Sequence, residues 1–240
     1  TYEVAVTAED ALGNATTDTT SNELVIDTTG PSAPTVTTLT TTDTTPTVQG
    51  TFDKDDGTVT QVVVNGETYL ASGSDLTVDA VNGTWSLTIP AGNALTDATY
   101  EVAVTAEDAQ GNETTDTTST ELEIDTTGPS APTVTTLTTN DLTPVIEGTA
   151  TVGTGETLTV EVSGATYEVA VSGGTWSLDL GTATPTSGTL TALTDGSSYN
   201  VIATVTDAAG NATSDTTSTE LEIDTTEPVV SSVVMSDSAL

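Results

Sequence analysis

The sequence repeats itself along its length. The segment that begins at Tyr2 returns at Tyr100 and, more loosely, at Tyr199, which gives a period of about 98 residues. The block 27–39 recurs almost letter for letter at 125–137. This period is longer than that of the usual solenoids and matches a whole small domain. The repeat is therefore the expected folding unit, and the chain is expected to be a tandem array of small domains.

The repeat sets the expected domain boundaries. Residues 1–27 hold the C-terminal strands of a preceding repeat, residues 28–125 and 126–224 are complete repeats, and residues 225–240 begin a further, divergent one. Because chains rarely end in the middle of a domain, this register predicts an excerpt of a longer protein.

The composition excludes several function classes. The chain has 36 acidic residues against one basic residue, Lys54, and carries a formal charge of −35. Such a chain repels nucleic acid and anionic membrane surfaces and attracts cations. The sequence has no long apolar run, so no membrane insertion is predicted for this segment. It also has no His and no Cys, and its carboxylates recur in every repeat instead of converging once, so we expect no enzyme.

Apolar residues alternate with polar ones in the first complete repeat, which argues against disorder. The expected strands are 35–39, 47–52, 59–65, 67–70, 76–78, 83–89, 100–106 and a last strand that ends at 122–124. Asn65-Gly66 is a strong hairpin signal. About seven strands at this spacing predict an all-β fold, an antiparallel sandwich of two sheets.

Side-chain directions follow from the strand period. In the last strand, Leu122 and Ile124 are expected to point inward, whereas Glu121, Glu123 and Asp125 are expected to point outward. Trp85 and its counterpart Trp176 lie in strands whose pattern favours burial in the core over stacking on a carbohydrate.

Tyr100 and Tyr199 each open the strand before the last one and follow a turn. This placement is typical of the tyrosine corner of Greek-key sandwiches.

Four motifs together resemble one family. They are the Asp-Thr-Thr-x-Pro linker at 27–31, the Gly-Thr-Trp-Ser strand at 83–86, the Asp-x-x-Gly-Asn loop at 108–112 and the Glu-Leu-x-Ile-Asp ending at 121–125. They resemble the bacterial immunoglobulin-like repeats of the extender region of giant repeats-in-toxin and biofilm-associated adhesins. The resemblance implies tandem immunoglobulin-like Greek-key sandwiches arranged end to end, in a secreted protein of the bacterial cell surface. It also implies that they project a distal binding region and that Ca²⁺ stiffens their joints.

An argument from the residues also places cations at the joints between neighbouring repeats. The loop between the last two strands of such a sandwich lies at the end where the N-terminus of the domain enters. Asp108 and Asn112 are therefore expected near Asp27, and likewise Asp207 and Asn211 near Asp125. Asp43, Asp97 and Asp141 are expected in turns at the opposite ends of their domains. Carboxylate and amide oxygens of this kind suit Ca²⁺.

Alternatives remain open at this stage. The same Asp and Asn residues are also common turn formers, and the Asp-rich segment 53–57 is expected to be a solvated turn. A second functional hypothesis is a glycan- or protein-binding module that uses the variable loop 181–188. A third is a subunit of a surface filament or sheath, in which lateral self-association of chains matters.

Overall fold

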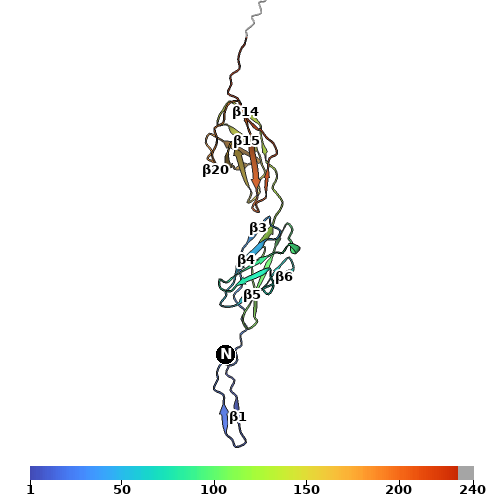
Figure 1. Cartoon of the computed structure of the whole chain (residues 1–240), viewed down its shortest axis with the longest axis vertical. Helices are drawn as coiled ribbons and strands as arrows, with labels where there is room; N and C mark the ends of the chain where they lie inside the picture. The colour runs from blue at the N-terminus through green and yellow to red at the C-terminus, as the bar shows by residue number, and fades with distance from the viewer. Residues whose placement is uncertain (232–240) are drawn as a thin grey trace, which may run out of the picture. The chain divides into compact units, whose positions relative to one another are not determined.

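The fold is all-β, as the sequence predicts. The computed structural model describes residues 1–231, which contain strands, one short 3-10 helix and no α-helix. The chain divides into two units, Thr1–Ile124 and Asp125–Leu240, and each contains one immunoglobulin-like sandwich (Figure 1). Most of the divergent repeat expected at 225–240 lies outside the described residues.

Ten strands build the first sandwich. They are β3 (Leu39–Thr41), β4 (Thr47–Thr51), β5 (Thr58–Val64), β6 (Glu67–Leu70), β7 (Leu76–Asp79), β8 (Thr84–Thr88), β9 (Ala98–Tyr100), β10 (Val102–Glu107), β11 (Glu113–Thr115) and β12 (Leu122–Ile124), with the 3-10 helix η1 (Ala91–Asn93). Their order is β4-β8-β7 in one sheet, and β11-β10-β5-β6 and β3-β12-β9 in two others. Because β9 runs almost directly into β10, these last two sheets are continuous and form the second layer.

Alternation of side chains produces the core. Val48 on β4 and Trp85 and Leu87 on β8 are buried, while the Thr residues that flank them are exposed. In the expected strand 100–106, the alternate residues Val102, Val104 and Ala106 are buried and so share the face that points into the core. The predicted Asn65-Gly66 hairpin joins β5 to β6, with positive φ at both residues as a two-residue turn requires.

The first expected strand, 35–39, divides between the two layers. The Thr35 and Thr37 N–H groups donate to carbonyls of Thr51 and Gln49, at 2.9 Å each. Leu39 then donates to the Glu121 carbonyl at 2.7 Å, and β3 runs parallel to β12 in the other layer. Periodicity could not predict this change of partner, because a strand that crosses between layers keeps its alternation.

The tyrosine corners form in both sandwiches. The Tyr100 hydroxyl donates to the Thr96 carbonyl at 2.8 Å and accepts from the Thr96 N–H at 3.1 Å. The Tyr199 hydroxyl accepts from the Thr194 N–H at 2.8 Å. Each tyrosine therefore ties its strand back to the turn before it.

The second sandwich has a similar plan. Its strands are β13 (Thr133–Val134), β14 (Leu137–Thr139), β15 (Val145–Thr149), β16 (Thr157–Val162), β17 (Ala165–Glu168), β18 (Val171–Ser172), β19 (Thr175–Asp179), β20 (Ser187–Gly188), β21 (Ser197–Tyr199), β22 (Val201–Thr206), β23 (Ala212–Ser214) and β24 (Leu221–Ile223). They form the sheets β13-β15-β19-β18, β20-β17-β16-β22-β23 and β14-β24-β21. The variable segment 181–188 supplies β20, which adds an edge strand beside β17.

Residues 1–27 form a hairpin of β1 (Thr7–Glu9) and β2 (Ala15–Thr17). Its apolar residues Val4, Val6 and Leu24 are exposed. The matching residues of the next repeat are core residues. No helix in the described part of the chain is long and apolar enough to cross a membrane.

Candidate functional site

The Asp108 carboxylate organises the loop between β10 and β11. Its Oδ1 atom accepts hydrogen bonds from the backbone N–H groups of Gln110 (2.8 Å) and Asn112 (2.9 Å). Its Oδ2 atom accepts from the Asn112 side-chain amide at 2.8 Å. The loop is thus built around one carboxylate, as turns that begin with Asp commonly are.

Asn112 links this loop to the segment that enters the domain. Its Nδ2 atom donates to the Asp27 carbonyl at 3.3 Å. In the second sandwich, Asn211 Nδ2 donates to the Asp125 carbonyl and to Asp207 Oδ2, both at 2.9 Å. The structure therefore brings together the two expected groups, one of Asp27, Asp108 and Asn112 and the other of Asp125, Asp207 and Asn211. The contact uses the backbone of the first residue in each group, not its carboxylate.

The remaining expected ligands lie in turns. Asp43 Oδ1 accepts from the Thr45 N–H, and Asp141 Oδ1 accepts from the Thr143 N–H, both at 2.8 Å. Asp97 lies in a bend just before β9. The Leu95 N–H donates to the Thr44 carbonyl at 2.8 Å, so the segments that carry Asp43 and Asp97 run close together.

Hydrogen bonds favour the ionised form of the loop carboxylates. The side-chain amide of Asn112, followed by its backbone N–H, lowers the pKa of Asp108. Desolvation opposes ionisation of Asp207, but hydrogen bonds from Asn211 and from the backbone of Gly210 and Ala209 together outweigh it, so the pKa of Asp207 is also lowered. Both carboxylates therefore stay negative at neutral pH.

The Asp108 loop is expected to loosen in acid. Its folded-state pKa lies below the value of about 3.9 found in unfolded chains, so its stabilising effect is complete above that value. This effect is lost as the pH falls through the folded-state pKa. An NMR titration of the Asn112 side-chain amide should therefore show a transition below the ordinary Asp value. The transition should disappear in Asp108→Asn; a midpoint at or above the ordinary value would contradict the assignment.

Sequence reasoning missed other polar contacts. The Asp195 carboxylate accepts hydrogen bonds from the Thr225 N–H at 2.6 Å and from the Thr226 hydroxyl at 3.0 Å. The hydrogen bond from the Thr225 N–H is the main reason that the pKa of Asp195 is lowered. Its alignment with Asp97 could have identified it. Asp56, in the turn expected to be solvated, accepts from the Ser32 N–H at 2.8 Å. The Asp195 and Asp56 carboxylates therefore each bind a segment that flanks the sandwich to which they belong.

One predicted side-chain direction is wrong. Glu121 was expected to point outward, but it is 3% exposed. The reason is that the strand is interrupted just before β12, where Thr120 has a φ of 66°, so the period-two pattern does not extend back to Glu121. Its carboxylate turns inward and accepts from the Val102 N–H at 3.2 Å.

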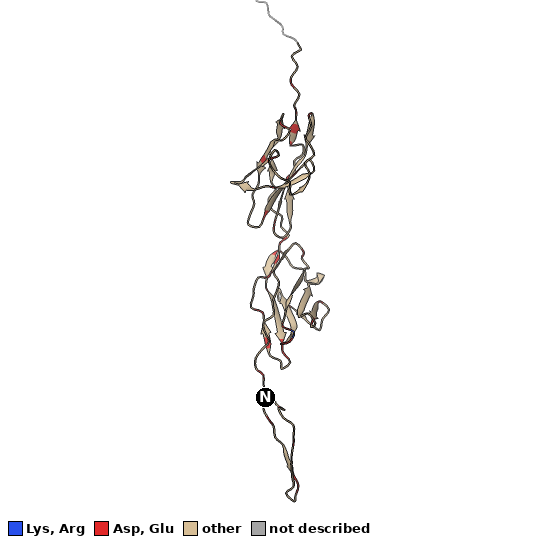
Figure 2. Ribbon diagram, turned by 90° about the vertical axis from the view of Figure 1, so that its left-hand side faces the viewer, with Lys and Arg blue, Asp and Glu red and all other residues tan. Residues whose placement is uncertain are grey.

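Carboxylates gather in threes at two places in the described chain. The groups are Glu3, Asp18 and Glu23, and Glu101, Asp116 and Glu121, each with carboxylate oxygens within 4.8 Å of one another. None of the nine residues expected to bind cations belongs to these groups. Carboxylates are nevertheless spread over both sandwiches (Figure 2). A cation at an expected position would thus need amide or carbonyl oxygens as well.

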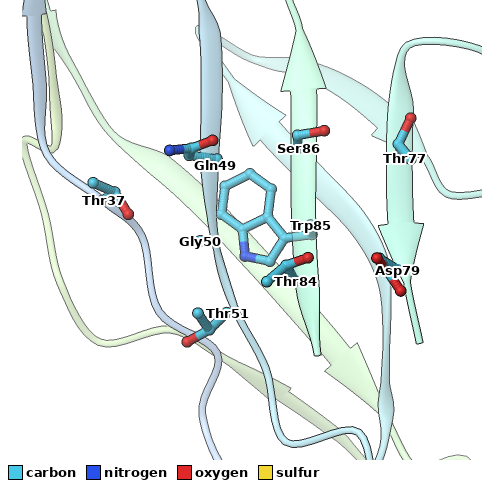
Figure 3. Close-up of a pocket in the computed structure, with 9 residues that line it drawn as sticks. All are labelled: Thr37, Gln49, Gly50, Thr51, Thr77, Asp79, Thr84, Trp85 and Ser86. Atoms are coloured by element: carbon cyan, nitrogen blue, oxygen red, sulfur yellow. The ribbon is translucent and has the colours of Figure 1, made fainter. Parts of the chain in front are cut away.

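Both tryptophans are core residues. Trp85 and Trp176 are each 2% exposed, and their Nε1 atoms donate to the carbonyls of Thr35 (3.1 Å) and Thr133 (3.2 Å). A hollow of about 340 Å³ lies beside Trp85, whose indole crosses Gly50 next to Gln49 (Figure 3). Because the ring face is buried, it cannot stack on a sugar, and the core interpretation is confirmed.

Solved structures with similar folds come from several sources. One comes from work on the host cell surface retention of a 1.5-MDa bacterial ice-binding adhesin. It is 25% identical to this chain, with a TM-score of 0.41, and the match covers 92% of this chain and 74% of that one. A tetra-tandem repeat in the extending region of a large adhesion protein is 25% identical, with a TM-score of 0.32 and coverage of 87% and 53%. A chimeric titin Z1Z2 is 16% identical, with a TM-score of 0.38 and coverage of 83% and 99%. No curated protein is similar enough in sequence to count as a match.

The sequence of each sandwich also matches a family. The model of the bacterial Ig-like domain matches residues 34–126 and again residues 134–225, which together make up well over half of the chain. The chain therefore belongs to the bacterial Ig-like domain family and carries two tandem copies of that domain.

Proposed function

We propose that this chain is a structural extender of a bacterial surface adhesin, outside the cell, that holds a distal binding region away from the surface. The observation that carries the proposal is the tandem arrangement of two complete domains of one family, each with its own buried core. The motifs that resemble adhesin extender repeats support it. The charge of −35 would keep neighbouring chains apart and soluble.

The extender acts mechanically and has no catalytic role. The sequence offers no His or Cys as a base or nucleophile. The carboxylates of the loops serve their own turns, as the three hydrogen bonds to Asp108 illustrate. The alternative of a filament or sheath subunit stays a prediction, and a chain that remains monomeric at high concentration would weigh against it.

Calcium at the joints is the second part of the proposal. Asp27 and Asp125 precede the two complete sandwiches, and their carbonyls contact the Asn112 and Asn211 side chains. Hard oxygen donors would therefore be available from the loop carboxylates and from these backbone groups, as Ca²⁺ prefers. Bound Ca²⁺ would offset the repulsion between the carboxylates and restrict movement of the segments that precede each sandwich.

Small-angle scattering with and without calcium tests the joints. We expect millimolar Ca²⁺, the usual affinity range of extracellular calcium modules, to narrow the distribution of interdomain distances, and a chelator to broaden it again. Asp108→Asn with Asp207→Asn, which removes the loop carboxylates, should weaken the response. Asp55→Asn, which removes an exposed carboxylate paired with Lys54, should leave it intact. A profile that ignores calcium would contradict calcium-stiffened joints.

A further inference from the structure

The last hairpin of the first sandwich is interrupted in its middle. Regular pairing joins Thr105 to Thr115 at one side of the interruption and Tyr100 to Leu122 at the other. Between these pairs, the short segment 101–104 faces the longer segment 116–121. The longer segment must therefore bulge: the Asp116 N–H still donates to the Val104 carbonyl at 2.9 Å, and beyond this bond the backbone leaves the ladder.

Carboxylates take the place of the missing ladder carbonyls. Asp116 Oδ1 accepts from the Val104 N–H at 2.7 Å, and Glu121 Oε2 accepts from the Val102 N–H at 3.2 Å. Both N–H groups belong to buried residues of β10, which would otherwise lack partners. The two side chains are thus fixed with their carboxylates against the interrupted strand.

The other oxygen of Glu121 has no hydrogen-bond partner. Its Oε1 atom is buried and unpaired, and the whole residue is 3% exposed. A buried carboxylate oxygen without a partner is costly, because the charge loses its hydration and gains nothing in return. Such an atom is expected to contact a ligand that the protein chain itself does not supply.

Neighbouring carboxylates make this cost larger. Oxygens of Glu101, Asp116 and Glu121 lie within 4.8 Å of one another. Partial desolvation, followed by the charges of Glu121 and Asp116, raises the pKa of Glu101. The chain can hardly neutralise the cluster itself, since its one basic side chain, Lys54, pairs with Asp55.

We propose that Glu101, Asp116 and Glu121 form a binding site for a divalent cation inside the first sandwich, with Ca²⁺ as the expected ion. Three carboxylates provide hard oxygen ligands, and Ca²⁺ takes about six to eight of them in flexible geometry. Glu101 is exposed and Asp116 is half-buried, so the ion enters from solvent and water completes its shell. The ion would bind Glu121 Oε1 and fasten the two strands across the bulge. The site lies within one domain and does not depend on calcium at the joints.

The second sandwich provides a natural control. There the same bulge recurs, with Val201 donating to Glu220 at 3.0 Å and Ala203 donating to Asp215 at 2.8 Å. Glu220 Oε1 is also buried without a partner, so the two copies differ in the third carboxylate and not in the unpaired oxygen. Asn200 stands in the place of Glu101, and its Oδ1 atom accepts from the Thr219 N–H at 2.8 Å. Because one charged ligand is replaced by an amide, this copy should bind Ca²⁺ much more weakly. It also indicates that the fold tolerates Asn at this position.

NMR of the ¹⁵N-labelled chain, titrated with CaCl₂ at neutral pH, tests the site. We expect the Val102 and Val104 amide signals to shift with calcium, while those of Val201 and Ala203 shift far less. Glu101→Asn should weaken calcium binding at this site by about tenfold or more, since affinity follows the number of charged ligands. The reverse change, Asn200→Glu, should give the Val201 and Ala203 signals a calcium response.

Other outcomes would overturn the proposal. The proposal is wrong if the Val102 and Val104 signals stay unchanged at calcium concentrations far above the range in which extracellular modules typically bind. It is also wrong if Glu101→Asn leaves the calcium response of these signals unaltered. Signals that move only on acidification would contradict it as well, because the cluster would then bind a proton and not a cation. Asp108→Asn with Asp207→Asn separates this site from the joints: it should alter the scattering response and leave the Val102 shift intact.

Discussion

Replacement of Trp85 by alanine is expected to lower the free energy of unfolding of the first sandwich by about 3–5 kcal/mol. The indole is 2% exposed and is the largest side chain in a core that includes Val48, Leu87 and Val104. Its removal leaves a cavity between two sheets that cannot collapse without breaking their ladders. It also leaves the Thr35 carbonyl without its indole partner.

The second sandwich should be unaffected, because its core residues form a separate cluster around Trp176. The chain has two tryptophans, so Trp85→Ala leaves Trp176 as a fluorescent reporter of the other domain. Calorimetry should show the unfolding transition of the first sandwich at a lower temperature. Trp176 fluorescence should show that the unfolding transition of the second sandwich is unchanged. Trp85→Phe, which keeps an aromatic ring, should cost less. If both transitions moved together, the domains would not be independent folding units.

Much of this fold is readable from the sequence because its signals are local. The alternation in 100–106 and the Asn65-Gly66 turn depend only on adjacent residues, and both appear where expected. Proximity of Asp108 and Asn112 to Asp27 followed from topology, which the repeat made predictable. Whether these residues bind calcium remains a prediction, because their hydrogen bonds are those that turn formers also make.

The acidic cluster could not be predicted in the same way. Glu101 lies between β9 and β10 and Glu121 lies just before β12. Their approach depends on a bulge that shifts the register between the Tyr100–Leu122 and Thr105–Thr115 pairs. Periodicity assigned Glu121 to the solvent face because it assumed a continuous strand. One signal was present: the pattern of Glu, Asp and Glu recurs at Glu3, Asp18 and Glu23 with the same spacing.

Gly50 is expected to be nearly as important as the tryptophan that crosses it. A Cβ atom at this position would collide with the Thr35 carbonyl oxygen and lie 2.8 Å from Trp85 Nε1. Gly148 has the same relation to Thr133 and Trp176 in the second sandwich. The backbone cannot easily yield, since Thr35 also donates to the Thr51 carbonyl at 2.9 Å.

Gly50→Ala should therefore destabilise the first sandwich by about 1–3 kcal/mol or more, as overpacking of a closed core does. Urea denaturation should show this loss, whereas Gly92→Ala, with no atom within 4 Å of the added Cβ, should stay within about 0.5 kcal/mol of the parent. Equal effects of the two changes would contradict the argument. The clash depends partly on the indole, so Gly50→Ala combined with Trp85→Ala should cost less than the sum of the two single changes. This coupling arises because Gly50 has no side chain, so the Trp85 indole can cross it and reach the strand segment that contains Thr35.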